Sequence, residues 1–233
     1  MRLRASVIIL IAIGLGACST GPRHSVDPSH EAWQARTDAG RVAFERGQYD
    51  EAEQLFNQAL TQAEAFGPAD ARLATSLNNV ATVDRIRKRY PEAESLDRRA
   101  LSIQEQTLGS NHLFVATTLL GIADSCRAQA RYADAAAAAT RAMSIRAAAL
   151  GPDHVDVAAA TYNLGLTYAA ENRYDDAAPL FERVIAIYER SLGPQDPRLA
   201  WVLDSYAALL RHSPRASEAR ALEQRAASIR AAQ

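Results

Sequence analysis

The sequence predicts an all-α solenoid of about five helix pairs. The main observation is a period of 42 residues that runs through most of the chain. Four glycines keep this period without a break, at Gly67, Gly109, Gly151 and Gly193. Tyrosines and alanines recur at nearly the same interval, at Tyr49, Tyr90, Tyr132 and Tyr174 and at Ala52, Ala93, Ala135, Ala177 and Ala219. A fixed period of roughly 20–50 residues is typical of repeat proteins, in which each unit packs on its neighbours.

The fourth period shows why each repeat should contain two helices. We expect a first helix from about Val155 to Glu171, followed by a turn over residues 172–174. Asp175 then opens a second helix, whose apolar residues lie three and four positions apart and so form one stripe. Gly193 and the proline after it end this helix, because glycine accepts a left-handed conformation and proline cannot continue a helix.

Applied to the whole chain, the period predicts five helix pairs, over residues 31–66, 70–108, 112–150, 154–192 and 196–231. At least three repeats are needed for a stable stack, so five are sufficient. Small residues recur where the first helix of each pair should approach the second, at Gly40, Ala81, Ala123, Gly165 and Ala207. Aspartates in the connections are expected to cap the following helices, at Asp153, Asp156 and Asp196.

The spacing of five residues in the fourth pair resembles the tetratricopeptide repeat (TPR). Gly165 is small, Tyr168 and Phe181 are aromatic, and Ala177 and Val184 are small and apolar. Together with the period of 42 residues, this spacing is similar to the kinesin-light-chain type of TPR, in which both helices are longer than usual. The resemblance implies a right-handed superhelical α-solenoid that binds proteins or peptides.

The resemblance covers residues 31–231, and two of its repeats depart from the pattern. Asp84 and Asp97 occupy positions where TPR units prefer apolar residues, so the second pair should pack loosely or pair these carboxylates with arginines. The candidate arginines are Arg85, Arg87, Arg98 and Arg99. The third pair has alanines at 135–139, which suit close helix approach but bury little apolar area.

In TPR domains the first helix of each pair lines a concave groove that holds the partner. Carried over to the matching positions, the partner-binding residues are Asn78, Asn79, Arg85, Asp124, Arg127, Tyr162, Asn163, Trp201 and Arg211. Thr82, Gly121, Leu166, Asp204 and Ser205 occupy the other inward positions. Asparagine can bind a peptide backbone, arginine a carboxylate, and the aromatic residues a side chain. The alternative is that these residues are merely solvated.

The N-terminus is expected to be a signal peptide over residues 1–17. Arg2 and Arg4 form a basic region, and residues 5–17 are apolar but too few to span a bilayer. The sequence Leu-Gly-Ala-Cys that ends at Cys18 resembles the lipobox of bacterial lipoproteins.

This second resemblance implies that Cys18 is lipidated and attaches the chain to a membrane. In this class Ser19 favours the outer membrane, and residues 18–30 would form a flexible tether. An ordinary cleaved signal, or a buried cysteine, is the alternative for Cys18.

Composition and motifs argue against several other classes. The net charge is −1 and no basic block is present, so a nucleic-acid partner is not expected. His112 and His154 lie one period apart and are expected in turns rather than at a metal site. Cys126, which replaces an aromatic residue of the motif, should be buried. No catalytic motif is present, so we expect no enzymatic activity, cofactor or metal.

The leading hypothesis is therefore a non-catalytic TPR scaffold or adaptor, anchored by lipid to the periplasmic face of the outer membrane. Its partner would be a periplasmic or outer-membrane protein or peptide. The alternative is an envelope protein that binds a small ligand or glycan with Tyr162 and Trp201 as stacking surfaces. An enzyme is a third class, which no motif supports.

Overall fold

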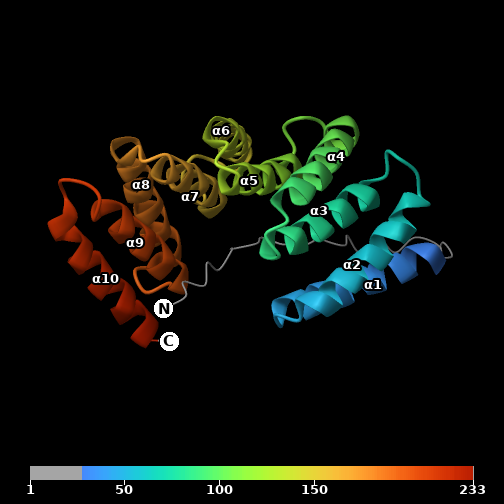
Figure 1. Ribbon diagram of the computed structural model, residues 1–233, viewed down its shortest axis with the longest axis horizontal. Coiled ribbons are helices and arrows are strands. Elements are labelled where there is room, and N and C mark those ends of the chain that lie inside the picture. The colour runs from blue at the N-terminus through green and yellow to red at the C-terminus, as the bar shows by residue number, and fades with distance from the viewer. Residues whose placement is uncertain (1–27, 233) are drawn as a thin grey trace.

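The computed structural model describes residues 28–232, which contain ten α-helices and no β-strand (Figure 1). The expected signal peptide, Cys18 and most of the expected tether lie outside the described residues. The helices are α1 (Pro28–Glu45), α2 (Tyr49–Glu64), α3 (Ala71–Ile86), α4 (Tyr90–Leu108), α5 (Leu113–Ala128), α6 (Tyr132–Leu150), α7 (Val155–Ala170), α8 (Tyr174–Leu192), α9 (Pro197–Leu210) and α10 (Ala216–Ala231). No helix among them is both long and apolar enough to cross a membrane.

The five predicted helix pairs are confirmed, and their ends differ from the expected ones by only a few residues. The largest difference is at the start, where α1 begins at Pro28 and includes the last three residues of the expected tether. The helices stack into an arch, with α3, α5, α7 and α9 toward its inner side (Figure 1). Among these four helices, α3 contacts α5, α5 contacts α7 and α7 contacts α9. The even-numbered helices contact mainly the odd-numbered helices beside them.

The helices on the inner side begin with side-chain caps that follow the repeat period. Asp70 and Asp196 each accept a hydrogen bond from the backbone N–H two residues later, at 2.8 and 2.9 Å. His112 and His154 do the same through Nδ1, at 3.1 Å in both cases. The turn location expected for these histidines is confirmed, and so is the cap at Asp196. The expectation that Asp153 or Asp156 caps α7 is wrong, because His154 lies at the N-cap position.

Close approach within a pair depends on the small residue of the first helix. A Cβ atom at Gly40 would lie 2.6 Å from two ring atoms of Phe56. At Gly165 it would lie 3.2 Å from the ring of Phe181. Both rings are buried, so they occupy the space that a larger residue would need.

The core is a chain of clusters between neighbouring helices. The cluster around Phe181 joins α7, α8, α9 and α10, and a separate cluster of α5 and α6 is rich in alanine. Cys126 belongs to the second cluster and is completely buried, as expected. Burial raises the pKa of its thiol to about 11, which keeps the thiol protonated at neutral pH.

The aspartates of the second pair are buried in ion pairs. Asp97, which is 1% exposed, contacts Arg85, one of the four arginines expected. Asp84 instead pairs with Arg89, at 2.6 Å, which the sequence did not suggest. Of the two expectations for this repeat, loose packing or pairing with the candidate arginines, the pairing is confirmed for Asp97.

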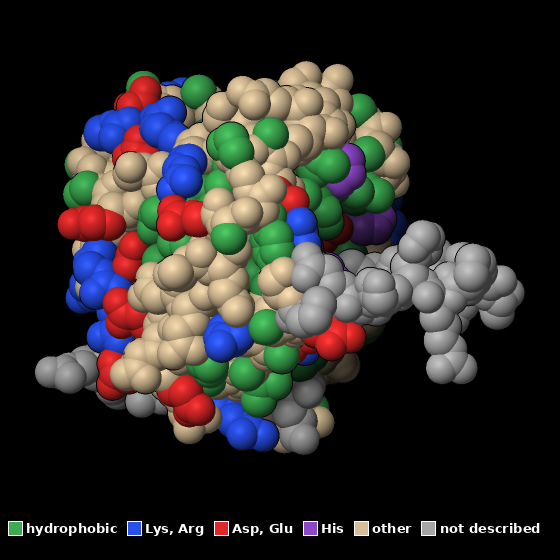
Figure 2. Space-filling model, turned by 90° about the vertical axis from the view of Figure 1, so that its right-hand side faces the viewer, with side chains coloured by type: hydrophobic (Ala, Val, Ile, Leu, Met, Phe, Trp, Pro, Cys, Tyr) green, Lys and Arg blue, Asp and Glu red, His purple; other side chains and the backbone are tan. Residues whose placement is uncertain are grey.

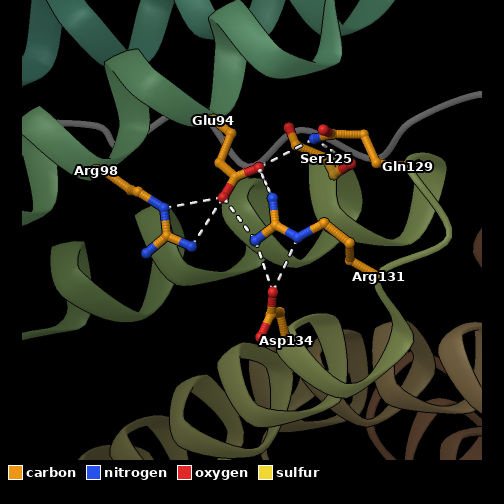
Figure 3. A network of polar contacts seen from close by, with 6 residues as sticks. All are labelled: Glu94, Arg98, Ser125, Gln129, Arg131 and Asp134. Atoms are coloured by element: carbon orange, nitrogen blue, oxygen red, sulfur yellow. Dashed lines mark hydrogen bonds and ion pairs between the residues drawn. The ribbon is translucent and has the colours of Figure 1, made fainter.

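A carboxylate on α4 joins the second pair to the third (Figure 3). Glu94 is 6% exposed and accepts hydrogen bonds from Arg131 at 2.7 and 3.0 Å, from Arg98 at 2.9 Å and from Gln129 at 3.0 Å. Arg131 also contacts Asp134 on α6, at 2.6 Å. Burial alone would raise the pKa of Glu94, but these hydrogen bonds outweigh burial and bring the pKa down to about 2.

Gly40→Ala should lower the free energy of unfolding by about 1–2 kcal/mol. The new methyl group would overlap the buried Phe56 ring, and the helix propensity of alanine offsets only about 1 kcal/mol of that cost. Gly165→Ala should cost less, because its closest contact is longer. Urea denaturation followed by circular dichroism measures both. Equal losses, or a gain in stability from Gly40→Ala, would contradict this account of the packing.

Glu94→Gln should lower the free energy of unfolding by about 1.5–3 kcal/mol at neutral pH, because charge-assisted hydrogen bonds are lost. The folded-state pKa lies below the usual 4.5, so the contribution is complete above about pH 4.5 and disappears as the pH falls toward 2. Urea midpoints measured from pH 7 to 2.5 should therefore converge for the two proteins. Glu92→Gln, at an exposed position of the same helix, is the control and should have little effect at any pH.

Candidate functional site

The predicted partner-binding residues lie along the inner helices, where several of them connect one helix to the next. Asn78 Nδ2 on α3 donates to Thr118 Oγ1 on α5, at 2.8 Å. Asn163 Nδ2 on α7 donates to Asp124 Oδ1 on α5, also at 2.8 Å. The Tyr162 hydroxyl contacts Ser205 Oγ on α9, at 2.7 Å. We call this set of contacting helices and their inward side chains the inner row.

Arg85 lies within the inner row but is held by its own chain. Its guanidinium contacts Asp97 Oδ2 and also donates to Thr82 Oγ1, at 3.0 Å. A Cβ atom at Gly121 would lie 2.8 Å from Arg85 Nη1 and 2.6 Å from Asp97 Oδ2. The glycine on α5 therefore leaves the space that this ion pair occupies. Burial raises the pKa of Asp97 to about 7, although Arg85 acts in the opposite direction.

Asp124 occupies the centre of a second cluster in the inner row. Besides the bond from Asn163, its Oδ1 accepts from Arg127 Nη2, at 2.9 Å. Both charged side chains are half-buried. One carboxylate oxygen thus fixes an amide from α7 and a guanidinium from its own helix.

Three polar atoms of predicted partner-binding residues are buried without a hydrogen-bond partner among the described residues. They are Asn78 Oδ1, Asn163 Oδ1 and Arg127 Nε. Asn163 as a whole is only 8% exposed. Leaving a buried polar atom without a partner costs about 1–3 kcal/mol, and a ligand would reach these atoms only after the surrounding side chains moved.

The remaining predicted residues differ in how accessible they are. Asn79 is half-exposed, and its side chain makes no hydrogen bond to another described residue. Trp201 on α9 is 40% exposed, an unusual exposure for so large an apolar side chain. Tyr162, by contrast, packs edge-on against Phe181 and is partly buried. Arg211 is exposed and pairs with Glu223 on α10.

Two hollows of the described surface lie away from the inner row. One, of about 330 Å³, is at the turns around Tyr174 and His212. The other, of about 480 Å³, is beside Pro152 and Leu192. Within residues 28–232 no group of His, Cys, Asp and Glu side chains could hold a metal ion.

Sequence reasoning missed the residues that support the row from behind. Thr118 Oγ1, which receives the bond from Asn78, itself donates to Gln104 Oε1, at 2.7 Å. Thr118 is 2% exposed and does not occupy one of the inward positions. No spacing rule indicates it, because the contact depends on how α4 and α5 pack.

The chain is similar to several solved helical-repeat structures. Kinesin-light-chain TPR-like repeats from Podosopora anserina are 23% identical, with a TM-score of 0.71, and the match covers 88% of this chain and 97% of that one. BtubC from P. vanneervenii is 21% identical, with a TM-score of 0.70 and coverage of 88% and 92%.

A third match is the Rap conjugation gene regulator of plasmid pLS20 in complex with the Phr* peptide. It is 15% identical, with a TM-score of 0.69, and the match covers 91% of this chain and 59% of the regulator. At these identities the likeness establishes the fold alone. No curated protein shows significant sequence similarity to the chain.

The match to a sequence family is more extensive. Four overlapping segments, residues 33–85, 72–148, 116–190 and 156–232, match the tetratricopeptide repeat family. Together they span nearly all the described residues, and the chain belongs to the tetratricopeptide repeat family.

Proposed function

We propose that this protein is a non-catalytic scaffold whose inner row binds an extended segment of a partner protein. The observation that carries the proposal is the accessible side chain of Asn79 on the inner row, which makes no hydrogen bond to another described residue. An extended peptide offers backbone N–H donors at regular intervals, which asparagine side chains can accept whatever the peptide sequence. The similar fold of the Rap conjugation gene regulator, whose structure is in complex with the Phr* peptide, supports the choice of ligand.

The positions of Asn79 and Asn163 also support an extended ligand. They are two repeat periods apart and occupy the same place in their repeats. Within residues 28–232 the Asn79 side chain makes no hydrogen bond, so its amide is available to a ligand. Trp201 adds an exposed aromatic surface on α9. The alternative of a small ligand stacked between Tyr162 and Trp201 has less support, because the Tyr162 ring is engaged with Phe181 and Ser205.

We further propose that the scaffold works at the bacterial envelope, on the periplasmic face of the outer membrane, with a periplasmic or outer-membrane partner. The basis is the lipobox-like sequence that ends at Cys18 and the serine that follows it. Acyl chains on that cysteine would tether the solenoid near the lipid surface.

Asn79→Ala should weaken peptide binding about tenfold, since it removes one or two hydrogen bonds of about 1 kcal/mol each. A displayed random library of peptides of about 12 residues, roughly 40 Å long when extended, would supply the ligand. The best peptide would then be titrated by fluorescence anisotropy. Asn57→Ala, an exposed asparagine on the outer helix α2, is the matched control and should bind like wild type. Equal affinity for both variants would place the binding site elsewhere.

Cys18→Ser should release the protein from membranes, because the lipid would have no attachment point. Labelling cells with a palmitate analogue and fractionating the envelope would measure this effect. The wild-type chain should carry label and sediment with outer membranes, and the variant should do neither. An unlabelled wild-type chain would refute lipidation without affecting the proposal for the inner row.

A further inference from the structure

The charged side chains of the inner row are neutralised within the chain from the second helix pair to the fifth. Arg85 contacts Asp97, and Arg127 contacts Asp124 at 2.9 Å. In the last pair Arg211 contacts Glu223, and Asp204 contacts Arg230 at 2.6 Å. The inward residues that remain are neutral, and they include Asn78, Asn79, Thr82, Tyr162, Asn163 and Ser205.

These pairs limit what the row can recognise. An arginine binds a ligand carboxylate strongly when its N–H fork is free. Here a ligand carboxylate would have to displace Asp97, Asp124 or Glu223 from its arginine. The negative charge of the displaced side chain would remain nearby and repel the ligand. A basic ligand would likewise be repelled by the arginines that are paired with these carboxylates. Neither sign of charge gains net attraction from the row.

We infer that the inner row selects extended segments that carry no net charge, read through backbone hydrogen bonds and through an apolar side chain placed against Trp201. This inference rests on the proposed function and specifies its ligand. Asn79 and Asn163 would bind the backbone, and the ion pair of Arg85 and Asp97 lies beside Gly121, midway between them in the repeat.

The charge pattern outside the row is consistent with this reading. On the end of the molecule shown in Figure 2, basic and acidic side chains are interspersed rather than separated into large patches. At this end, mixed charges of this kind give no strong field of one sign that would attract a highly charged partner. Recognition would then depend on short-range contacts along the row.

The test is a displayed library of random peptides of about 12 residues, selected on the intact chain at about pH 8, where Asp97 is ionised. The recovered peptides should be neutral on average. Their affinity should change less than about twofold between roughly 50 and 300 mM salt, because no net charge is paired on binding.

Glu223→Gln is the variant that should change the selectivity of the row. This substitution leaves Arg211 without its carboxylate partner at an exposed place, so folding should be unaffected. The variant should recover peptides enriched in Asp and Glu, and their affinity should fall as salt rises. Glu218→Gln is the control: it removes the same charge from the same helix but affects a pair with Arg215 instead.

The outcomes separate the two proposals. Enrichment of acidic or basic peptides on the wild-type chain, with steep salt dependence, would overturn the neutral selectivity and leave peptide binding intact. Failure of Glu223→Gln to shift the recovered peptides would also overturn it. Recovery of no peptide from the wild-type chain, with a peptide-binding TPR protein as the library control, would overturn the proposed function itself.

Discussion

The close approach of the two helices within each pair is the constraint on which the rest of the structure depends. Gly40 and Gly165 bring the first helix onto an aromatic ring of the second, and alanines hold the same place in the other pairs. Two helices packed in this way still expose one apolar side, which the next helix pair covers. In the central repeats the inner helices are shorter than the outer ones, with 16 residues against 19, and the backbones of the inner helices approach one another more closely along the stack. The solenoid therefore curves toward its inner row.

That curvature explains why polar side chains gather on the inner helices. Successive inner helices lie close enough for Asn78, Asn163 and Tyr162 to hydrogen-bond across to a neighbouring inner helix. These bonds fix the side chains in place but use only part of their capacity, since the oxygens of both asparagines remain unpaired and buried. A surface of this kind is preorganised, because little rotamer freedom is left to lose on binding.

The repeat period predicted the helix pairs to within a few residues, because helix ends follow from local spacing. The inward positions were carried over from the resemblance to TPR domains, and their role in binding stays a prediction. The repeat period also contained the capping pattern, since Asp70, His112, His154 and Asp196 are one period apart, although histidine was not expected to serve as a cap. The ion pairs could not be read in this way. Whether Arg85 is free or bound depends on Gly121 and Asp97, which lie on two other helices, and on rotamers that no spacing specifies.

Gly121 shows how a single position changes the character of the row. Asn79 and Asn163 occupy the same place in the neighbouring odd-numbered helices, so a third asparagine would make three equivalent contacts in succession. Glycine removes that contact, and the freed space holds Arg85 against a carboxylate that is 1% exposed. An arginine held in this way fills space and holds its neighbours in place through hydrogen bonds, but the ion pair that it forms carries little net charge. Two backbone contacts flanking a neutralised centre favour a ligand chosen for its extended form over one chosen for its charge.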